Sequence, residues 1–297
     1  MITRSLGRGA PPVSAIGYGG MPLSISGRPS EAQAIRAVHA ALDSGMTLID
    51  TADVYCLDDN DLGHNERIIA RALKEWGGQQ DGIVVATKGG LVRPRGNWVR
   101  KGDPAHLRAA CERSLRALGV SRIDLYQLHA PDPRVPFADS VATLAELQGA
   151  GKIRWVGLSN VDVGEIEQAR RIVEITSVQN RLSVFFREAL ETGFLRDPSV
   201  VEHCGREGLG FLAYSPAGGG RLNLKLPGHP VLSRIARQHG ASAHAVATAW
   251  VLAQGPTVIP IPAGRTADHV KDAASSADLE LTPAELDEIS GASYSRA

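Results

Sequence analysis

The sequence carries no excess charge of either sign and no long apolar run. Its 297 residues include 32 lysines and arginines against 32 aspartates and glutamates, so the formal net charge is +0. This balance argues against nucleic-acid binding and against a polybasic membrane patch. No apolar run approaches the ~18 residues that span a bilayer, and residues 1–20 lack the continuous apolar core of a signal peptide. These absences predict a cytoplasmic protein that binds neither nucleic acid nor membrane.

Cysteine is also scarce. Only Cys56, Cys111 and Cys204 occur, far apart and without a C-x-x-C pair. An odd number at such spacing suggests neither a disulfide framework nor a thiolate zinc site. We expect reduced thiols, as in the cytosol, and for Cys56 a small apolar packing role in preference to redox chemistry.

What the sequence does contain is a regular alternation of short β-branched runs with longer segments of helical period. Several runs, such as IVVAT and VIPI, are almost wholly apolar, which is typical of strands buried on both faces. The predicted strands are Ala15–Gly19, Thr47–Asp50, Ile83–Lys88, Ile123–His129, Trp155–Ser159, Thr176–Asn180, Gly210–Ser215 and Val258–Ile261. Eight such strands with helical crossovers predict an α/β fold, a single (β/α)8 TIM barrel domain over residues 1–297.

Capping residues mark the helix starts. Ser30 and Asp162 each precede a Gln or Glu by three residues, and Asp103 and Thr282 each precede a proline. We also expect a short N-terminal hairpin. Two helices are predicted beyond the eightfold pattern, at Pro230–His239 and Pro283–Ala292.

An open doubly wound sheet is the alternative architecture. It predicts a G-x-G-x-x-G turn directly after the first strand, at the start of a helix. Here Gly17-Tyr18-Gly19-Gly20 continues into Met21-Pro22 and a polar loop. The pattern does not match, and no Pro/Gly/Ser-rich linker divides the chain, so the barrel is favoured.

Polar residues end most of the apolar strands. In a barrel the carboxyl ends of all strands meet on one face, where the βα loops carry the chemistry. Tyr55 lies on the loop that follows Asp50. The residues at the strand ends are Asp50, Lys88, His129, Ser159, Asn160, Gln179, Asn180, Tyr214 and Ser215.

Seven short motifs at these strand ends resemble those of the aldo-keto reductases. In order they are IDTADVY, GHNE, ATKGG, LYQLHAPD, GKIRWVGLSN, SVQN and AYSP, and they extend over nearly the whole chain. The resemblance implies a barrel that binds a nicotinamide dinucleotide without a Rossmann domain. It implies reduction of an aldehyde or ketone to an alcohol, or the reverse, with Asp50, Tyr55, Lys88 and His129 as the catalytic group.

Elementary chemistry supports these four assignments. Hydride transfer to a carbonyl carbon leaves negative charge on oxygen, and the Tyr55 hydroxyl is a suitable proton donor. We expect the Lys88 ammonium to lower the pKa of this phenol, and Asp50 to neutralise and orient Lys88. His129 is expected to hydrogen-bond the substrate oxygen. Each residue alone is better explained by structure, as a turn residue, a solvated charge or a hydrogen-bonded histidine; together they indicate a site.

The resemblance also implies the cofactor site. Ser159, Asn160 and Gln179 match residues that bind the nicotinamide carboxamide, and Tyr214 matches the aromatic that stacks on the ring. The loop from Ser215 is rich in glycine, which suits approach to a pyrophosphate. The full set of expected cofactor residues is Gly20, Met21, Asp50, Ser159, Asn160, Gln179, Tyr214, Ser215, Pro216, Gly218, Gly220, Arg265, His269 and Asp272.

Two of these residues bear on cofactor choice. Arg265 matches a position that meets the ribose 2′-phosphate, and His269 follows one helical turn later. An arginine suits a phosphate, so NADPH (NADP+) is favoured over NADH. The family commonly has Glu then Asn at the adenine contact, whereas this chain has Asp272 and Ala273, which leaves the adenine site open.

The loops that usually determine substrate choice predict the substrate site only in outline. We predict that Trp98, in LVRPRGNWVRKGD, and an acidic loop with Asp58, Asp59 and Asp61 form opposite walls of the substrate mouth. The acids would favour a hydroxylated or amine-bearing carbonyl substrate. Tyr55, Trp98 and His129 are the expected substrate contacts, although solvated loops are the default interpretation.

Two other functions are considered. The first is a cofactor-binding regulatory subunit on the same fold, like the β subunits of potassium channels, with little turnover. The second is a metal-dependent barrel hydrolase, which would need an H-x-H pair on an early strand; only His129 ends a strand, so no metal is expected. The natural substrate, the direction in the cell and the oligomeric state stay open.

Overall fold

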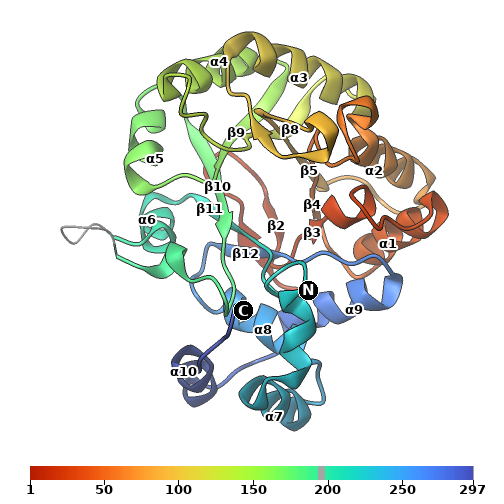
Figure 1. The fold of residues 1–297 in the computed structure, drawn as a ribbon, viewed down its shortest axis with the longest axis vertical. Helices are drawn as coiled ribbons and strands as arrows, with labels where there is room; N and C mark the ends of the chain where they lie inside the picture. Colours follow the sequence, from red (N-terminus) through yellow and green to blue (C-terminus); the bar gives the residue numbers. More distant parts are fainter. Residues whose placement is uncertain (193–197, 297) are drawn as a thin grey trace.

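A parallel barrel forms the centre of the molecule. The structure is a computed structural model, and it describes residues 1–192 and 198–296. Figure 1 shows the strands surrounded by helices. Each barrel strand pairs in parallel with the next along the chain. The strands are β3 (Tyr18–Gly19), β4 (Leu48–Asp50), β5 (Val84–Gly89), β8 (Ile123–Leu128), β9 (Ile153–Ser159), β10 (Ile175–Arg181), β11 (Gly210–Tyr214) and β12 (Val258–Ile261).

The eight predicted strands are therefore confirmed, and the sheet closes on itself. Gly17 N donates to Pro260 O and Gly19 N donates to Pro262 O, each at 2.9 Å, which joins the first strand to the last. The first strand is shorter than predicted because the chain reaches its paired position only at Tyr18.

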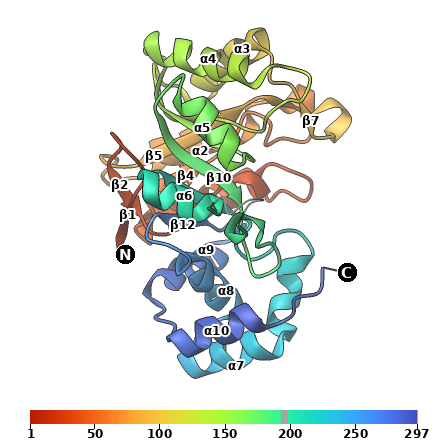
Figure 2. The same cartoon turned by 90° about the vertical axis from the view of Figure 1, so that its left-hand side faces the viewer.

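Helices cover the outside of the barrel, and α7 and α10 pack together beyond one side of it (Figure 2). The predicted caps Ser30, Asp103, Asp162 and Thr282 each accept a backbone N–H of the first turn. The helices are α1 (Glu31–Asp43), α2 (His64–Glu75), α3 (Pro104–Leu118), α4 (Phe137–Gly149), α5 (Val163–Arg170), α6 (Val200–Glu207), α7 (Pro230–His239), α8 (Ala243–Leu252), α9 (Ala267–Ser275) and α10 (Pro283–Gly291). No helix within the described ranges has the length and apolar character needed to cross a bilayer.

Short elements fill the connections. A small antiparallel ribbon, which the sequence pattern did not reveal, follows β5. These elements are η1 (Met21–Leu23), η2 (Asp59–Asp61), β6 (Leu91–Val92), η3 (Pro94–Gly96), β7 (Val99–Arg100), η4 (Glu188–Leu190), η6 (Leu222–Gly228) and η7 (Ser276–Asp278).

The predicted N-terminal hairpin closes the amino-terminal end of the barrel. Its strands are β1 (Thr3–Ser5) and β2 (Pro12–Ser14). Arg4 Nη1 lies 2.5–2.8 Å from three carbonyl oxygens, at the end of α8, in the loop that follows it and at the start of β12. Gly7 has φ 131°, and a Cβ there would lie 1.8 Å from Thr176 O, so only glycine fits this approach.

The barrel interior changes from apolar to polar along the strands. Leu48, Ala86 and Leu125 belong to the inner apolar cluster. Because side chains two residues apart point to the same face of a strand, Asp50, Lys88 and Gln127 continue these three rows. This alternation brings polar side chains together at the carboxyl-terminal end.

Candidate active site

The four side chains predicted to be catalytic form one cluster. Lys88 on β5 donates from Nζ to Asp50 Oδ1 on β4 at 2.5 Å and to the Tyr55 hydroxyl at 3.0 Å. Its third donor bonds the Thr51 carbonyl at 2.8 Å. The ring centroid of His129, directly after β8, lies 5.7 Å from that of Tyr55, edge to face. A phenol, an ammonium, a carboxylate and an imidazole thus share one end of the barrel.

The charges in this cluster are buried. The side chain of Lys88 is 0% exposed and that of Asp50 is 3% exposed. Two buried opposite charges are tolerated because each offsets the desolvation cost of the other. The pair is therefore held rigidly, and removal of one partner would leave the other uncompensated.

The protonation states differ from expectation at Tyr55. Burial, together with the Asp50 carboxylate, raises the pKa of Tyr55 well above 10, so the phenol stays protonated at neutral pH. These influences outweigh the lowering expected from Lys88, whose charge is paired with Asp50. Burial lowers the pKa of Lys88, and burial with the nearby Lys88 holds the pKa of His129 well below 6.5. His129 is thus a neutral imidazole, and its Nδ1 has no hydrogen-bond partner among the described residues.

Two glutamines bind the other oxygen of Asp50. Gln179 Nε2 donates to Asp50 Oδ2 at 2.7 Å, and Gln127 Nε2 lies 3.3 Å from the same oxygen. Gln179 is a predicted site residue, whereas Gln127 was missed. Its signal is the alternation along β8, which puts Gln127 on the same face as His129. The amides fix the orientation of the carboxylate from the side opposite Lys88.

Gly157 on β9 provides the space for one of these glutamines. A Cβ at this position would lie 2.8 Å from Gln127 Cγ and 3.0 Å from Ser177 Oγ. Real Cβ contacts are essentially never so short as the first of these distances. The polar layer is therefore packed as tightly as an apolar core.

A second group of buried charges adjoins β5, and sequence reasoning did not single it out. Asp53 and Glu66 are both 0% exposed. Thr87 donates to Glu66 Oε1 at 2.6 Å, and Arg113 Nη2 lies 3.4 Å from Asp53 Oδ2. Burial, with the charge of Glu66 as the second cause, raises the pKa of Asp53 to about 8. The available signal was the presence of carboxylates inside the motifs IDTADVY and GHNE.

The predicted nicotinamide residues lie beside the cluster. Asn160 has φ 59°, and its Nδ2 donates to the His129 carbonyl at 2.9 Å and to Ser159 Oγ at 3.1 Å. Its Oδ1 accepts the Tyr214 hydroxyl at 2.8 Å. Side chains at the ends of β9 and β11 are thereby joined to the catalytic cluster.

The glycine-rich loop after β11 has an unusual backbone conformation, with several residues in the left-handed region. Ser215 has φ 53°, and Gly218, Gly219 and Gly220 have φ 89°, 66° and 46°. Pro216 in the same loop is buried. Within the loop, Gly218 N donates to Ser215 O at 2.8 Å. The predicted contact of this loop with the pyrophosphate of a dinucleotide stays a prediction.

The Gly20–Met21 segment and Arg265 lie close together. Arg265 Nε and Nη2 lie 3.3 Å and 3.5 Å from the carbonyl oxygens of Pro22 and Ser26. Met21 packs against the apolar group that includes Tyr55. The segment thus connects the predicted phosphate-binding arginine with the catalytic end of the barrel.

His269 and Asp272 both lie on α9. The backbone N–H of His269 donates to the cap Thr266 at 3.3 Å, in the first helical turn. Asp272 Oδ2 accepts the Ser242 hydroxyl at 2.7 Å. One oxygen of Asp272 is therefore engaged inside the protein, and the other is the one that could meet an adenine.

Trp98 lies at the mouth of the site. Its ring centroid is 6.2 Å from that of Tyr55 and 6.4 Å from that of His129, and the residue is 46% exposed. The ribbon of β6 and β7 holds it there. Trp98 therefore lies beside the predicted proton donor.

The carboxylates of the acidic loop bond groups around them, and its predicted place as a wall of the substrate mouth stays a prediction. Asp58 accepts the backbone N–H of Asn60, Asp59 accepts that of Arg93, and Asp61 pairs with Arg28 at 2.5 Å. The loop is thereby fixed against its neighbours, which sequence reasoning could not foresee because the partners are distant in the chain.

Comparison with known proteins agrees with this geometry. The pattern of the Aldo/keto reductase family matches residues 15–293. The chain belongs to the aldo-keto reductase family. An uncharacterized oxidoreductase of Schizosaccharomyces pombe is 33% identical over 284 residues, which cover 93% of this chain and 86% of that protein.

Solved aldo-keto reductase structures have the same fold. The glycerol dehydrogenase of Gluconobacter oxydans is 29% identical with a TM-score of 0.80, over 97% of this chain and 94% of that one. An aldo-keto reductase of Klebsiella pneumoniae in complex with NADPH is 26% identical with a TM-score of 0.80, over the same shares. The protein is thus an NAD(P)H-dependent oxidoreductase on a TIM barrel.

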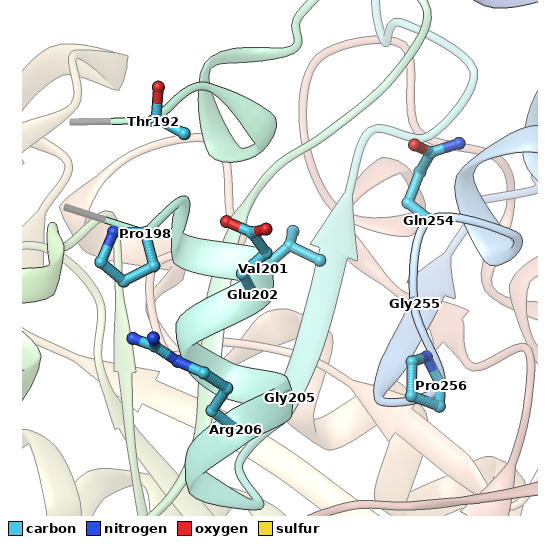
Figure 3. A pocket seen from close by; sticks show the side chains of 9 residues that line it. All are labelled: Thr192, Pro198, Val201, Glu202, Gly205, Arg206, Gln254, Gly255 and Pro256. Atoms are coloured by element: carbon cyan, nitrogen blue, oxygen red, sulfur yellow. The ribbon is translucent and has the colours of Figure 1, made fainter. Parts of the chain in front are cut away.

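A separate hollow of about 650 Å³ lies at α6 and the loop before β12. Figure 3 shows its lining, which includes Val201, Arg206 and Pro256. It contains none of the predicted site residues of this aldo-keto reductase.

Proposed function

We propose that this aldo-keto reductase reduces an aldehyde or ketone to an alcohol with NADPH, or runs the reverse reaction, with Tyr55 as the proton donor. The observation that carries the proposal is the contact of Lys88 Nζ with both the Tyr55 hydroxyl, at 3.0 Å, and Asp50, at 2.5 Å. The NADPH complex of the Klebsiella pneumoniae relative supports the choice of cofactor. In this proposal one barrel domain, residues 1–297, carries the whole site and works in the cytoplasm.

The proton step follows from the contacts. When bound in this site, NADPH would be the source of the hydride for the carbonyl carbon. The Tyr55 hydroxyl transfers its proton to the carbonyl oxygen, and the raised pKa of Tyr55 keeps that proton present at neutral pH. Lys88 Nζ stabilises the phenolate oxygen that remains, through a hydrogen bond that already exists. General acid help of this kind contributes ~10²–10⁴ in rate.

His129 positions the substrate oxygen in this proposal. Its pKa lies well below 6.5, so a neutral imidazole N–H and not a cation faces the developing negative charge. A neutral donor also avoids a second positive charge beside Lys88. Tyr55 and His129 together define where the carbonyl oxygen binds, with Trp98 beside them.

The cofactor would be held by residues at the ends of β3, β9, β10 and β11 and by residues after β12. Ser159, Asn160 and Gln179 would bind the carboxamide, and Tyr214 would stack on the nicotinamide ring. Gly20 and Met21 would border the same ring, and Ser215, Pro216, Gly218 and Gly220 would hold the pyrophosphate through the backbone. Arg265 and His269 would bind the 2′-phosphate, with Asp272 near the adenine.

The proposal is tested by Tyr55→Phe. We expect cofactor oxidation with a generic aromatic aldehyde to fall by ~10²–10⁴, while NADPH binding by fluorescence is unchanged. Arg265→Ala should weaken binding of NADPH and leave that of NADH unchanged. Full activity of Tyr55→Phe would contradict the proton-donor assignment. Cofactor binding without turnover by the unmodified protein would instead favour the regulatory-subunit alternative.

A further inference from the structure

Arg93 is a buried arginine beside the substrate mouth with unused hydrogen-bond donors. The residue is 6% exposed. Its Nη2 donates to the carbonyl of Cys56, next to Tyr55, at 3.3 Å. Its Nε and Nη1 have no hydrogen-bond partner in the part of the chain that the structure describes. Since the guanidinium stays charged in proteins, these donors are buried beside the site without an acceptor.

The guanidinium stacks on the tryptophan of the mouth. Arg93 Cζ lies 3.8 Å from the centroid of the Trp98 ring. The same ring lies 6.2 Å from Tyr55 and 6.4 Å from His129. Trp98 is therefore in contact with Arg93 and lies near both Tyr55 and His129. Because 46% of Trp98 is exposed, its ring can shift more easily than a core side chain.

Within residues 1–192 and 198–296, no carboxylate forms a direct ion pair with this guanidinium. Asp59 accepts the backbone N–H of Arg93 at 2.7 Å, not its side chain. Asp61 pairs with Arg28. A buried cation without a bonded anion carries a desolvation cost that a bound carboxylate would offset.

We propose that Arg93 determines substrate specificity by binding a carboxylate group carried by the carbonyl substrate. The inference rests on the proposed carbonyl reduction and deepens it. Trp98 covers the guanidinium, and the substrate displaces the ring as its carboxylate bonds Arg93 while its carbonyl lies at Tyr55 and His129. The reaction itself is unchanged, because Arg93 contributes only to binding.

The kinetic test compares matched aldehydes. These are benzaldehyde against 4-carboxybenzaldehyde, and butanal against 4-oxobutanoate, with glyceraldehyde against its 3-phosphate as the arm that separates carboxylate from phosphate. We expect Arg93→Met to lower kcat/KM for the carboxylates by about 10- to 100-fold, mainly through KM, since a charge-assisted hydrogen bond is lost. The kcat/KM for the neutral aldehydes should stay within about threefold of the value for the unmodified protein, because these substrates have no carboxylate for Arg93 to bind.

Two further variants keep the test decisive. Arg95→Met removes a cation from the same loop, and Arg95 is exposed; it should leave the ratio of carboxylate to neutral activity unchanged. Arg93→Gln keeps a planar amide that can stack on Trp98 and serves if Arg93→Met does not fold; it should lose the carboxylate preference as well. An equal loss on neutral and carboxylate substrates, an unchanged ratio, or a preference for the phosphate alone overturns the inference.

A binding measurement separates this inference from the proposed reaction. Quenching of tryptophan fluorescence by 4-(hydroxymethyl)benzoate needs no turnover, and Trp98→Phe identifies the part of the signal that comes from Trp98. Binding that is lost in Arg93→Met and kept in Arg95→Met supports the inference even if the protein reduces no carbonyl. Equal binding by the two variants overturns it, while activity with neutral aldehydes would leave the proposed reaction intact.

Discussion

Charged side chains bond partners inside the protein at both ends of the barrel, but their roles differ. At the amino-terminal end, Arg4 is bonded to three backbone carbonyls, and the hairpin around it covers an apolar cluster. At the carboxyl-terminal end, Lys88 and Asp50 are buried together, and Asp53 and Glu66 are buried close by. Arg4 at the amino-terminal end joins parts of the fold, whereas Lys88 at the carboxyl-terminal end bonds the Tyr55 hydroxyl.

This difference teaches that stability and chemistry are separated along the barrel axis. A change at the amino-terminal end should lower the free energy of unfolding and leave the folded enzyme active. A change at the carboxyl-terminal end should remove activity even where the fold survives. The substitutions below test that separation, from the largest expected effect to the smallest.

Lys88→Met should have the largest effect. It removes the hydrogen bond to the Tyr55 hydroxyl and leaves the buried Asp50 without its counter-charge. We expect activity to fall by ~10²–10⁴ and the free energy of unfolding to fall by about 3–5 kcal/mol. The double variant Asp50→Asn with Lys88→Met should recover stability without activity. Recovery of stability in urea unfolding together with recovery of activity in turnover assays would refute the separation of stability from chemistry.

Gly7→Ala should be the most damaging change at the other end. The new Cβ would lie 1.8 Å from Thr176 O, at a φ of 131° that L residues rarely adopt. We expect a loss of at least about 3 kcal/mol in the free energy of unfolding, measured by denaturant titration. The kcat of the fraction that remains folded should equal that of the unmodified protein. A lower kcat in that fraction would mean that the two ends are coupled.

Arg4→Met should have an intermediate effect on stability alone. It keeps the aliphatic stem but removes three hydrogen bonds to carbonyls at the end of α8 and at β12. We expect a loss of about 2 kcal/mol, because charge-assisted bonds contribute more than neutral ones. Thermal melts check this value, with the exposed Arg95→Met as a control that should not shift Tm. An unchanged Tm for Arg4→Met would show that water replaces these bonds at no cost.

Asp53→Asn should have the smallest effect near neutral pH, where it replaces a protonated carboxyl with a neutral amide, and its effect depends on pH. The folded-state pKa of Asp53 is raised by burial and by Glu66 from 3.8 to about 8. Between these values the folded protein holds a proton that the unfolded chain has lost, so stability decreases as pH rises toward 8 and is lost progressively through it. Asp53→Asn should flatten the fall in Tm between pH 5 and pH 9. Parallel curves of Tm against pH for Asp53→Asn and for the unmodified protein would contradict the protonation of Asp53 in the folded state.

Much of this arrangement is visible in the sequence. The alternation of apolar strands with helical segments predicts the barrel, polar strand ends bring Asp50, Lys88 and His129 to one face, and capping residues predict the helix starts. Period-two alternation along β8 would also have identified Gln127. These features are local, so they do not depend on how the chain folds over longer distances.

Other features depend on contacts between distant segments. The buried state of Arg93 follows from Asp59 and Cys56, more than thirty residues away in the chain. The raised pKa of Tyr55 depends on burial and on Asp50, which outweigh the expected influence of Lys88. Composition alone makes the LVRPRGNWVRKGD segment a solvated loop, and only the folded chain distinguishes Arg93 from its exposed neighbour Arg95.

The absence of a side chain at Gly157 limits how the site can be redesigned. Since even a methyl group there would collide with Gln127, no larger residue can be introduced on that row without displacing the amide from the Asp50 carboxylate. A single substitution at Gly157 is therefore not a suitable way to reshape this polar layer of the barrel. New substrate ranges are better sought by exchanging the surface loops above it, whose length and composition can change while the layer beneath stays intact.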